Sequence, residues 1–278
     1  KNDLFEQISI PICNADYNPC CTVGCFMALK ELVIHNIIQN NFPHYFEMVQ
    51  TITNSYEQIM KDPKVFDLPD FTEFLNCYSI ILPFLQEFYY EDENIELLLN
   101  PILEVFHIEE VVVHSALYDL LFSFFHNFYE KINESVMELI FEITMNSLSL
   151  LDRPEFIDPA INFWMNVAKF ETKIVKDSKN QKFTRRKCLE YKEFVVAAAP
   201  NLIEQMMLII TSFVPESPQP SLELENLETM NSFSICRDAI NCLRKFSALT
   251  GDIFNILIEY NLKPQITIKN KIFLLLEI

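Results

Sequence analysis

Glycine is almost missing from this 278-residue chain, which contains only Gly24 and Gly251. Tight hairpins, phosphate-cradling loops and nucleophile elbows need glycine, because backbone with positive φ, or in close approach to a ligand, does not tolerate a Cβ atom. The sequence therefore excludes a P-loop, a dinucleotide-binding fingerprint and a G-x-S-x-G hydrolase, and it disfavours a meandering β-sandwich. What remains is a chain of long helices joined by Pro, Asn and Asp turns.

Apolar residues recur at helical spacing almost throughout the chain, and half of all residues are hydrophobic, enough for a large core. We expect helices over residues 20–39, 43–60, 70–90, 94–106, 109–129, 133–150, 155–170, 184–213 and 232–249. In the first helix the pattern predicts an apolar stripe through Val23, Met27, Leu29, Val33, Ile34 and Ile37. We expect Gly251 to cap the helix that precedes it, and Trp164 to belong to the core.

The expected helices form consecutive antiparallel pairs of about 40 to 60 residues, a period typical of HEAT repeats. Such units cannot bury their apolar faces alone, so they stack into a solenoid. The predicted fold class is all-α, a HEAT-repeat α-solenoid of stacked antiparallel helix pairs, with a closed helical bundle as the alternative. Because the sequence begins with KNDLF and stops inside KIFLLLEI, residues 1–278 are expected to be one solenoid fragment of about five to six pairs.

The formal net charge of −18 is unevenly spread. Residues 65–130 carry thirteen Asp and Glu and no Lys or Arg. Such a surface would repel a phosphate backbone, so direct binding of nucleic acid is not expected. It would attract a basic partner, although the same acids could serve only to keep a very apolar protein in solution.

Two segments are predicted to connect helices. Residues 173–187 form a basic connection that includes Arg185, Arg186 and Lys187. It could be solvated, bind phosphate, act as a localisation signal or contact an acidic surface of the same chain. Residues 215–231 form a Pro/Glu-rich loop.

The sequence offers no constellation for catalysis or metal binding. Its eight cysteines include no C-x-x-C, and we interpret Cys21, Cys25, Cys236 and Cys242 as small core residues in a reducing compartment. His107 and His114 are seven residues apart, not the four that put two imidazoles on one metal. We therefore expect a protein that is not an enzyme and has no cofactor. The longest apolar stretch, residues 193–214, is interrupted by polar residues, so membrane insertion is not expected either.

Three segments resemble helices of importin-β and its karyopherin-β relatives, in order and approximate spacing over residues 108–255. The shared residues of the first segment, VVVHSALYDLL, are Val111, Val113, Ala116, Leu117 and Leu120. Those of the second, AINFWMNVAKFE, are Ile161, Phe163, Trp164, Asn166 and Val167. Those of the third, FSICRDAINCL, are Ser234, Cys236, Arg237, Ala239, Cys242 and Leu243.

The resemblance implies a nuclear transport receptor of the cytoplasm, nucleus and nuclear pore, which binds basic cargo or adaptor segments, Ran-GTP and FG-repeat nucleoporins without catalysis. A HEAT-repeat scaffold or a regulatory subunit of another complex is the alternative. The loop 215–231 matches the position of the family's acidic loop, although it lacks the unbroken Asp run and has Phe233 where the family has tryptophan. The candidate partner-binding residues are Glu91, Asp92, Glu93, Glu109, Glu110, Glu223, Glu225, Glu228 and Phe233.

Overall fold

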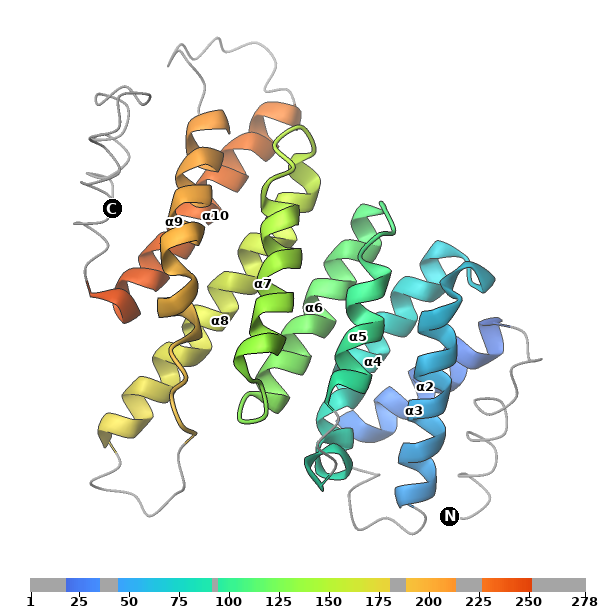
Figure 1. Cartoon of the computed structure of the whole chain (residues 1–278). Coiled ribbons are helices and arrows are strands. Elements are labelled where there is room, and N and C mark those ends of the chain that lie inside the picture. Colours follow the sequence, from blue (N-terminus) through green and yellow to red (C-terminus); the bar gives the residue numbers. More distant parts are fainter. Residues whose placement is uncertain (1–18, 36–44, 92–94, 181–188, 214–226, 252–278) are drawn as a thin grey trace. The chain divides into compact units, whose positions relative to one another are not determined.

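The computed structural model describes residues 19–35, 45–91, 95–180, 189–213 and 227–251, and within these residues it contains helices and no strand (Figure 1). The all-α prediction is therefore confirmed for this part of the chain. In chain order the helices are α2 (Pro19–Ile34), α3 (Tyr45–Lys61), the short 3-10 helix η1 (Pro63–Val65), α4 (Leu68–Glu91), α5 (Glu96–Val105), α6 (Val111–Phe128), α7 (Glu134–Leu148), α8 (Pro154–Asn180), α9 (Phe194–Phe213) and α10 (Leu227–Thr250).

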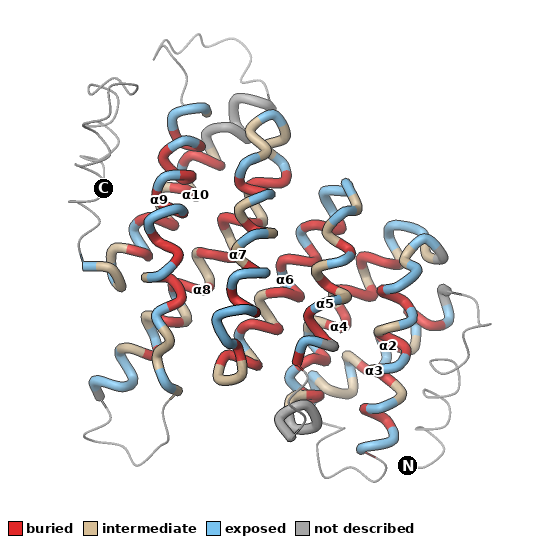
Figure 2. Tube along the Cα trace, viewed as in Figure 1, coloured by how far each residue is buried: buried red, intermediate tan, exposed pale blue. Residues whose placement is uncertain are grey.

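The chain divides into two compact units, Lys1–Val136 and Met137–Ile278. In the first unit α4 packs against both α2 and α6, while α5 contacts α3 and α6. In the second unit α10 packs against both α8 and α9. Along α3 and α9, buried positions recur every three to four residues, so each helix turns one face to its neighbours (Figure 2).

Aromatic rings fill the core of the first unit. Tyr56 of α3 stacks on Tyr78 of α4 with ring centroids 4.1 Å apart, and Phe26 of α2 meets Phe74 of α4 edge to face at 4.9 Å. All four side chains are fully buried. The Tyr56 hydroxyl donates a hydrogen bond to the Leu98 carbonyl of α5 at 2.8 Å. These contacts hold α2, α3, α4 and α5 together.

Pro83 lies inside α4, and its missing N–H is compensated by another helix. A helical residue at this position would donate to the carbonyl of Ser79, four residues earlier, but proline has no N–H. The hydroxyl of Ser123, on α6, donates to that carbonyl at 2.6 Å instead. The Ser123 hydroxyl therefore replaces the hydrogen bond that proline cannot donate within α4, and it also joins α4 to α6.

We predict that Ser123→Ala lowers the free energy of unfolding by about 1 to 2 kcal/mol, because it leaves the Ser79 carbonyl without a donor. In a Pro83→Ala background residue 83 regains its N–H, so the same substitution should cost little. Urea unfolding followed by circular dichroism measures both values, with the exposed Ser115→Ala on α6 as the matched control. An equal cost of Ser123→Ala in the two backgrounds would show that the compensation is unimportant.

Helix ends in this glycine-poor chain are satisfied by side chains from neighbouring helices. The Gln205 amide of α9 donates to the carbonyl of Leu148, the last residue of α7, at 2.8 Å. The Gln86 amide of α4 donates to the Asn127 carbonyl near the end of α6 at 2.7 Å. The last carbonyls of a helix have no partner within it, so these bonds supply what a glycine cap would otherwise arrange. As predicted, Gly251 directly follows the last residue of α10, Thr250, and it has a φ of 64°.

A buried carboxylate holds the N-terminus of α9. Glu171, on α8, is fully buried, and its Oε1 and Oε2 accept the N–H groups of Phe194 and Val195, each at 3.0 Å. These residues begin α9, so their N–H groups have no acceptor within the helix. Glu193, just before them, has a φ of 60°, in the left-handed region that favours glycine. Two charge-assisted hydrogen bonds therefore stabilise a strained helix start.

Two predicted connections are partly helical. Helix α8 continues to Asn180, so residues 173–180 of the predicted basic connection are helical, because lysine is a good helix former and Ile174 is buried. Helix α10 begins at Leu227, so residues 227–231 of the predicted loop 215–231 are also helical. These residues follow the last proline of the loop, and nothing in their sequence breaks a helix. Residues 181–188 and 214–226 lie outside the described part of the chain, and helix α9 begins at Phe194 rather than at residue 184.

Candidate protein-binding surface

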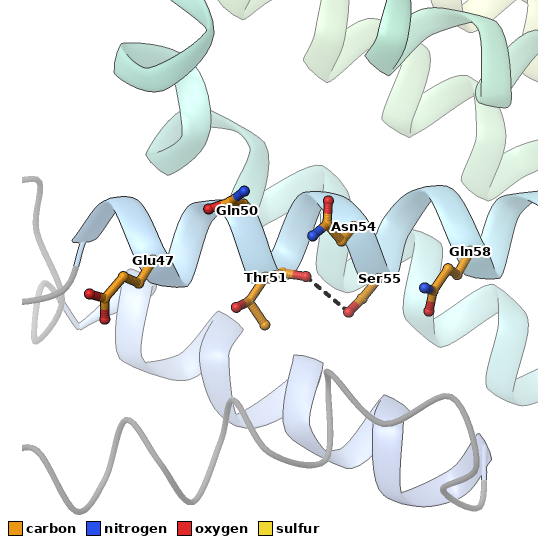
Figure 3. A pocket seen from close by; sticks show the side chains of 6 residues that line it. All are labelled: Glu47, Gln50, Thr51, Asn54, Ser55 and Gln58. Carbon is orange, nitrogen blue, oxygen red and sulfur yellow. Dashed lines mark hydrogen bonds between the residues drawn. The ribbon is translucent and has the colours of Figure 1, made fainter.

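A polar stripe runs along one face of α3 in the first unit. Its buried face carries Tyr45, Met48, Val49, Ile52, Tyr56, Ile59 and Met60. The polar face lines a groove of about 340 Å³, shown in Figure 3, whose residues are Glu47, Gln50, Thr51, Asn54, Ser55 and Gln58. We call these six residues the α3 stripe. Their positions repeat every three to four residues, so the amphipathic sequence of α3 places them on a single face.

Amide groups form the reachable part of the α3 stripe. Gln50, Asn54 and Gln58 are exposed, and their side chains make no hydrogen bond to any described residue. Ser55, by contrast, is buried and donates its hydroxyl to the Thr51 carbonyl at 2.9 Å. The groove therefore presents uncharged donors and acceptors from its long side chains, while its serine is satisfied by the helix itself.

Acidic residues lie on the neighbouring helix. Glu96 and Glu104 are both exposed on α5, and α5 contacts α3. The α3 stripe itself includes one acid, Glu47, and no Lys or Arg. The nearest basic residue along α3, Lys61, forms an ion pair with Glu57 at 3.7 Å. The surface of α3 and α5 is therefore polar with a negative charge.

The structure describes only part of the predicted acidic site. Glu109 and Glu110 are exposed immediately before α6, and Glu110 stands at the N-cap position without a side-chain capping bond. Glu91 is the last residue of α4. Asp92 and Glu93 lie outside the described residues. Of the first group of candidates, two side chains are thus placed at the surface.

The second group of candidates does not form a described loop. Glu223 and Glu225 lie outside the described residues. Glu228 is a residue of α10, so the prediction that it belongs to the loop 215–231 is wrong, because α10 begins earlier than the proline-rich composition indicated. Phe233 is also a residue of α10, as the predicted helix over residues 232–249 implies.

Some of the thirteen acids of residues 65–130 form hydrogen bonds or an ion pair with other groups of the protein. Glu73 accepts a hydrogen bond from the Lys30 ammonium group at 3.2 Å, which links α4 to α2. Asp67 accepts the Asp70 N–H at 2.9 Å and so caps the start of α4. The uniform acidic surface inferred from composition therefore includes carboxylates that have structural roles.

The described cysteines fall into two groups. Cys236 and Cys242 are buried on α10, as predicted, and Cys77 is buried on α4. Burial raises the pKa of the Cys236 thiol to about 11 and that of Cys77 to about 12. Cys21 is exposed and Cys25 half-buried, so the prediction that these two belong to the core is wrong.

We predict that Cys21 is alkylated rapidly at mildly alkaline pH, whereas Cys77, Cys236 and Cys242 stay unmodified until the protein unfolds. The reactive species is the thiolate, and a raised pKa together with burial removes it. Peptide mapping after a brief iodoacetamide pulse measures each site, and a pulse in denaturant is the control. Early labelling of Cys242 would contradict the structure.

The described residues contain no group of three or more His, Cys, Asp or Glu placed to hold a metal ion. His114 is buried, with its ring edge to face with that of Phe106 at 5.4 Å, whereas His107 is exposed and contacts the Glu104 carbonyl. The two histidines thus have separate surroundings. That the protein is not an enzyme remains a prediction.

Among the described helices, α9 alone is long and apolar enough to cross a membrane. Of its most apolar window, 61% is buried inside the protein, and the buried Gln205 uses its amide to bind the end of α7. These are the contacts of a helix packed within a folded unit. That the protein does not insert into membranes also remains a prediction.

The α3 stripe was not identified from the sequence. A solvated helix face and a binding face have the same polar composition, and only the spacing of Gln50, Asn54 and Gln58 distinguishes this one. The sequence matches no known protein family and no curated protein.

Proposed function

We propose that this protein is a non-catalytic helical-repeat scaffold that binds basic segments of partner proteins. The observation that carries the proposal is the packing within each unit. Helix α4 packs against α2 and α6, and α10 packs against α8, so alternate helices are in contact. A HEAT-type α-solenoid has this arrangement, because equivalent helices of successive pairs stack on one another.

The charge of the chain supports a basic partner. The net charge is −18, and the first unit exposes Glu96, Glu104, Glu109 and Glu110. An exposed ion pair contributes only about 0.2 to 1 kcal/mol, so binding must use several acids together. It should therefore weaken strongly as salt screens them.

The resemblance to importin-β extends the proposal to a nuclear transport receptor of the cytoplasm, nucleus and nuclear pore. In this form the protein binds basic cargo or adaptor segments, Ran-GTP and FG-repeat nucleoporins. The supporting features are the three resembling segments, which belong to α6, α8 and α10. Trp164, in the α8 segment, is fully buried, so this residue bears on the fold and does not itself contact a partner.

A pull-down tests the transport form directly. The immobilised protein is presented with a phenylalanine-glycine peptide against a serine-glycine control, and with Ran loaded with GTP against Ran loaded with GDP. Retention of the phenylalanine-glycine peptide and of Ran-GTP, but not of the controls, is the expected result. Binding of a basic peptide with neither of these would assign the protein to a scaffold or regulatory subunit of another complex.

A further inference from the structure

We propose that Cys21 and Cys25, on α2, hold one Cu(I) ion between their two thiolates. Both cysteines are free, Cys21 is exposed and Cys25 is half-buried. The inference does not depend on the binding of basic segments, because it concerns α2 alone.

The two thiols are spaced for a cation that bridges them. They stand four residues apart in α2, so their Cβ atoms lie about 5 to 6 Å apart on one side of the helix. A disulfide needs Cβ atoms about 3.5 to 4.5 Å apart, so the two sulfurs cannot bond directly without distorting the helix. A soft cation bonds a thiolate sulfur at about 2.3 Å, as Zn²⁺ does, so a linear S–Cu–S unit spans about 4.6 Å. The spacing therefore fits an ion between the sulfurs better than a direct bond.

The two thiols influence each other and are open to a cation. Partial burial, and then the neighbouring Cys21, raise the pKa of the Cys25 thiol. Two adjacent thiolates repel each other, and a cation between them removes this repulsion. Gly24, three residues after Cys21, has no side chain, and a Cβ atom added there would meet no other described side chain within 4 Å. Ala28, the next residue along this side of α2, is exposed and short. No large side chain of α2 therefore stands between Cys21 and Ala28 on this side.

The donor set selects the ion. Thiolate is a soft ligand, which suits Cu(I) and Zn²⁺ and does not suit Mg²⁺ or Ca²⁺. Structural Zn²⁺ takes four ligands, and the described residues contain no group of three or more His, Cys, Asp or Glu placed to hold a metal. Cu(I), a closed-shell monovalent ion, is stable with two thiolates in line.

The charge of the complex suits the start of α2. When Cu(I) binds, the two S–H protons leave to solvent and two S–Cu bonds form, which gives the complex a single negative charge. Cys21 belongs to the first turn of α2. The partial positive charge of a helix N-terminus favours a negative charge at this position.

Competition with a chelator tests the site. The full chain, reduced and kept under nitrogen with ascorbate, is titrated with Cu(I) in the presence of bathocuproine disulfonate, whose Cu(I) complex is coloured. We expect the wild-type protein to withdraw one Cu(I) per chain from the chelator. Cys21→Ser and Cys25→Ser should each weaken binding about a hundredfold or more, since loss of an outer partner of a metal ligand already costs about 10- to 100-fold.

Moving one thiol tests the spacing. In a Cys21→Ser background, Ala28→Cys places a thiol three residues from Cys25, on the same side of the helix, and should restore binding. In a Cys25→Ser background the same substitution places it seven residues from Cys21, or about 10.5 Å along the helix, which one ion cannot bridge, and binding should stay weak. These positions are exposed or half-buried, so the circular dichroism spectra should match that of the wild type.

Three results would overturn the site. Retention of Cu(I) by both Cys21→Ser and Cys25→Ser would assign the ion to other thiols. Equal binding by the two Ala28→Cys double variants would show that the spacing has no role. A wild-type protein that does not compete with the chelator would exclude the site outright, and none of these results bears on the binding of basic segments.

Discussion

Replacing Glu171 with alanine is expected to lower the free energy of unfolding of the second unit by about 3 to 5 kcal/mol, because two buried N–H groups then lose their acceptor and a cavity forms. The carboxylate accepts from Phe194 and Val195 at 3.0 Å, and its side chain is fully buried. Tyr191, close to the same helix start, has a buried hydroxyl without a hydrogen-bond partner among the described residues, and burial first, then Glu171 and Glu193, raises its pKa to about 12. Water therefore has little access to replace the lost bonds.

Chemical denaturation followed by the fluorescence of Trp164, the single tryptophan, measures this effect in the second unit. Glu171→Gln keeps one carbonyl acceptor and should cost about half as much. Glu138→Ala removes an exposed carboxylate from α7 and is the matched control, with an expected change within about 0.5 kcal/mol. A cost of Glu171→Ala no larger than that of Glu138→Ala would mean that the carboxylate does not hold α9.

Trp164→Ala is expected to destabilise the second unit by about 3 to 5 kcal/mol, the usual cost of deleting a large buried ring. Trp164 is fully buried, meets the rings of Phe141 and Phe163 near right angles, and donates its Nε1–H to Thr144 Oγ1 at 3.0 Å. Its contacts join α7 to α8.

Trp164→Phe separates the ring from the hydrogen bond. The Thr144 hydroxyl also donates to the Phe141 carbonyl at 2.9 Å, so it keeps a partner when the indole N–H is removed. We therefore expect Trp164→Phe to cost about 1 to 2 kcal/mol, well below Trp164→Ala. Thermal unfolding by circular dichroism measures both, with Leu208→Ala, on the exposed side of α9, as the control. Similar costs for Ala and Phe at position 164 would show that the ring contributes little.

Helix existence could be predicted from the sequence, because apolar spacing and the lack of glycine both favour helices. It was harder to predict which residues of a helix face the core where the helix is apolar on nearly all sides. In α2, Met27 and Ile34 were expected in the apolar stripe, but they are 43% and 48% exposed, whereas Phe26 is fully buried. When most residues are apolar, periodicity does not show which of them meet the neighbouring helix.

Long-range polar contacts could not be predicted. The bonds from Glu171 to the start of α9 and from Ser123 to the Ser79 carbonyl join residues 23 and 44 positions apart in the sequence. No local pattern encodes such a pair, because the fold alone brings its members together. The acidic character of the first unit was visible in the composition, whereas the α3 stripe needed the burial of the opposite face of α3 to become recognisable.

The most direct test of the binding function is the salt dependence of peptide affinity in charge variants of the two units. A labelled Lys-rich peptide is titrated by fluorescence anisotropy at low and high salt. The first-unit variant changes four exposed acids to Gln: Glu96, Glu104, Glu109 and Glu110. The control variant changes four exposed acids of the second unit to Asn or Gln: Glu138, Glu142, Asp177 and Glu190.

Both variants change the net charge by the same amount, so only the position of the acids differs. We predict that affinity falls steeply with salt and that the first-unit variant weakens it by tenfold or more, about 1.4 kcal/mol, while the control variant changes it little. Peptide binding that is insensitive to salt and equal in the two variants would show that these acids serve solubility alone, and would contradict the proposed binding of basic segments.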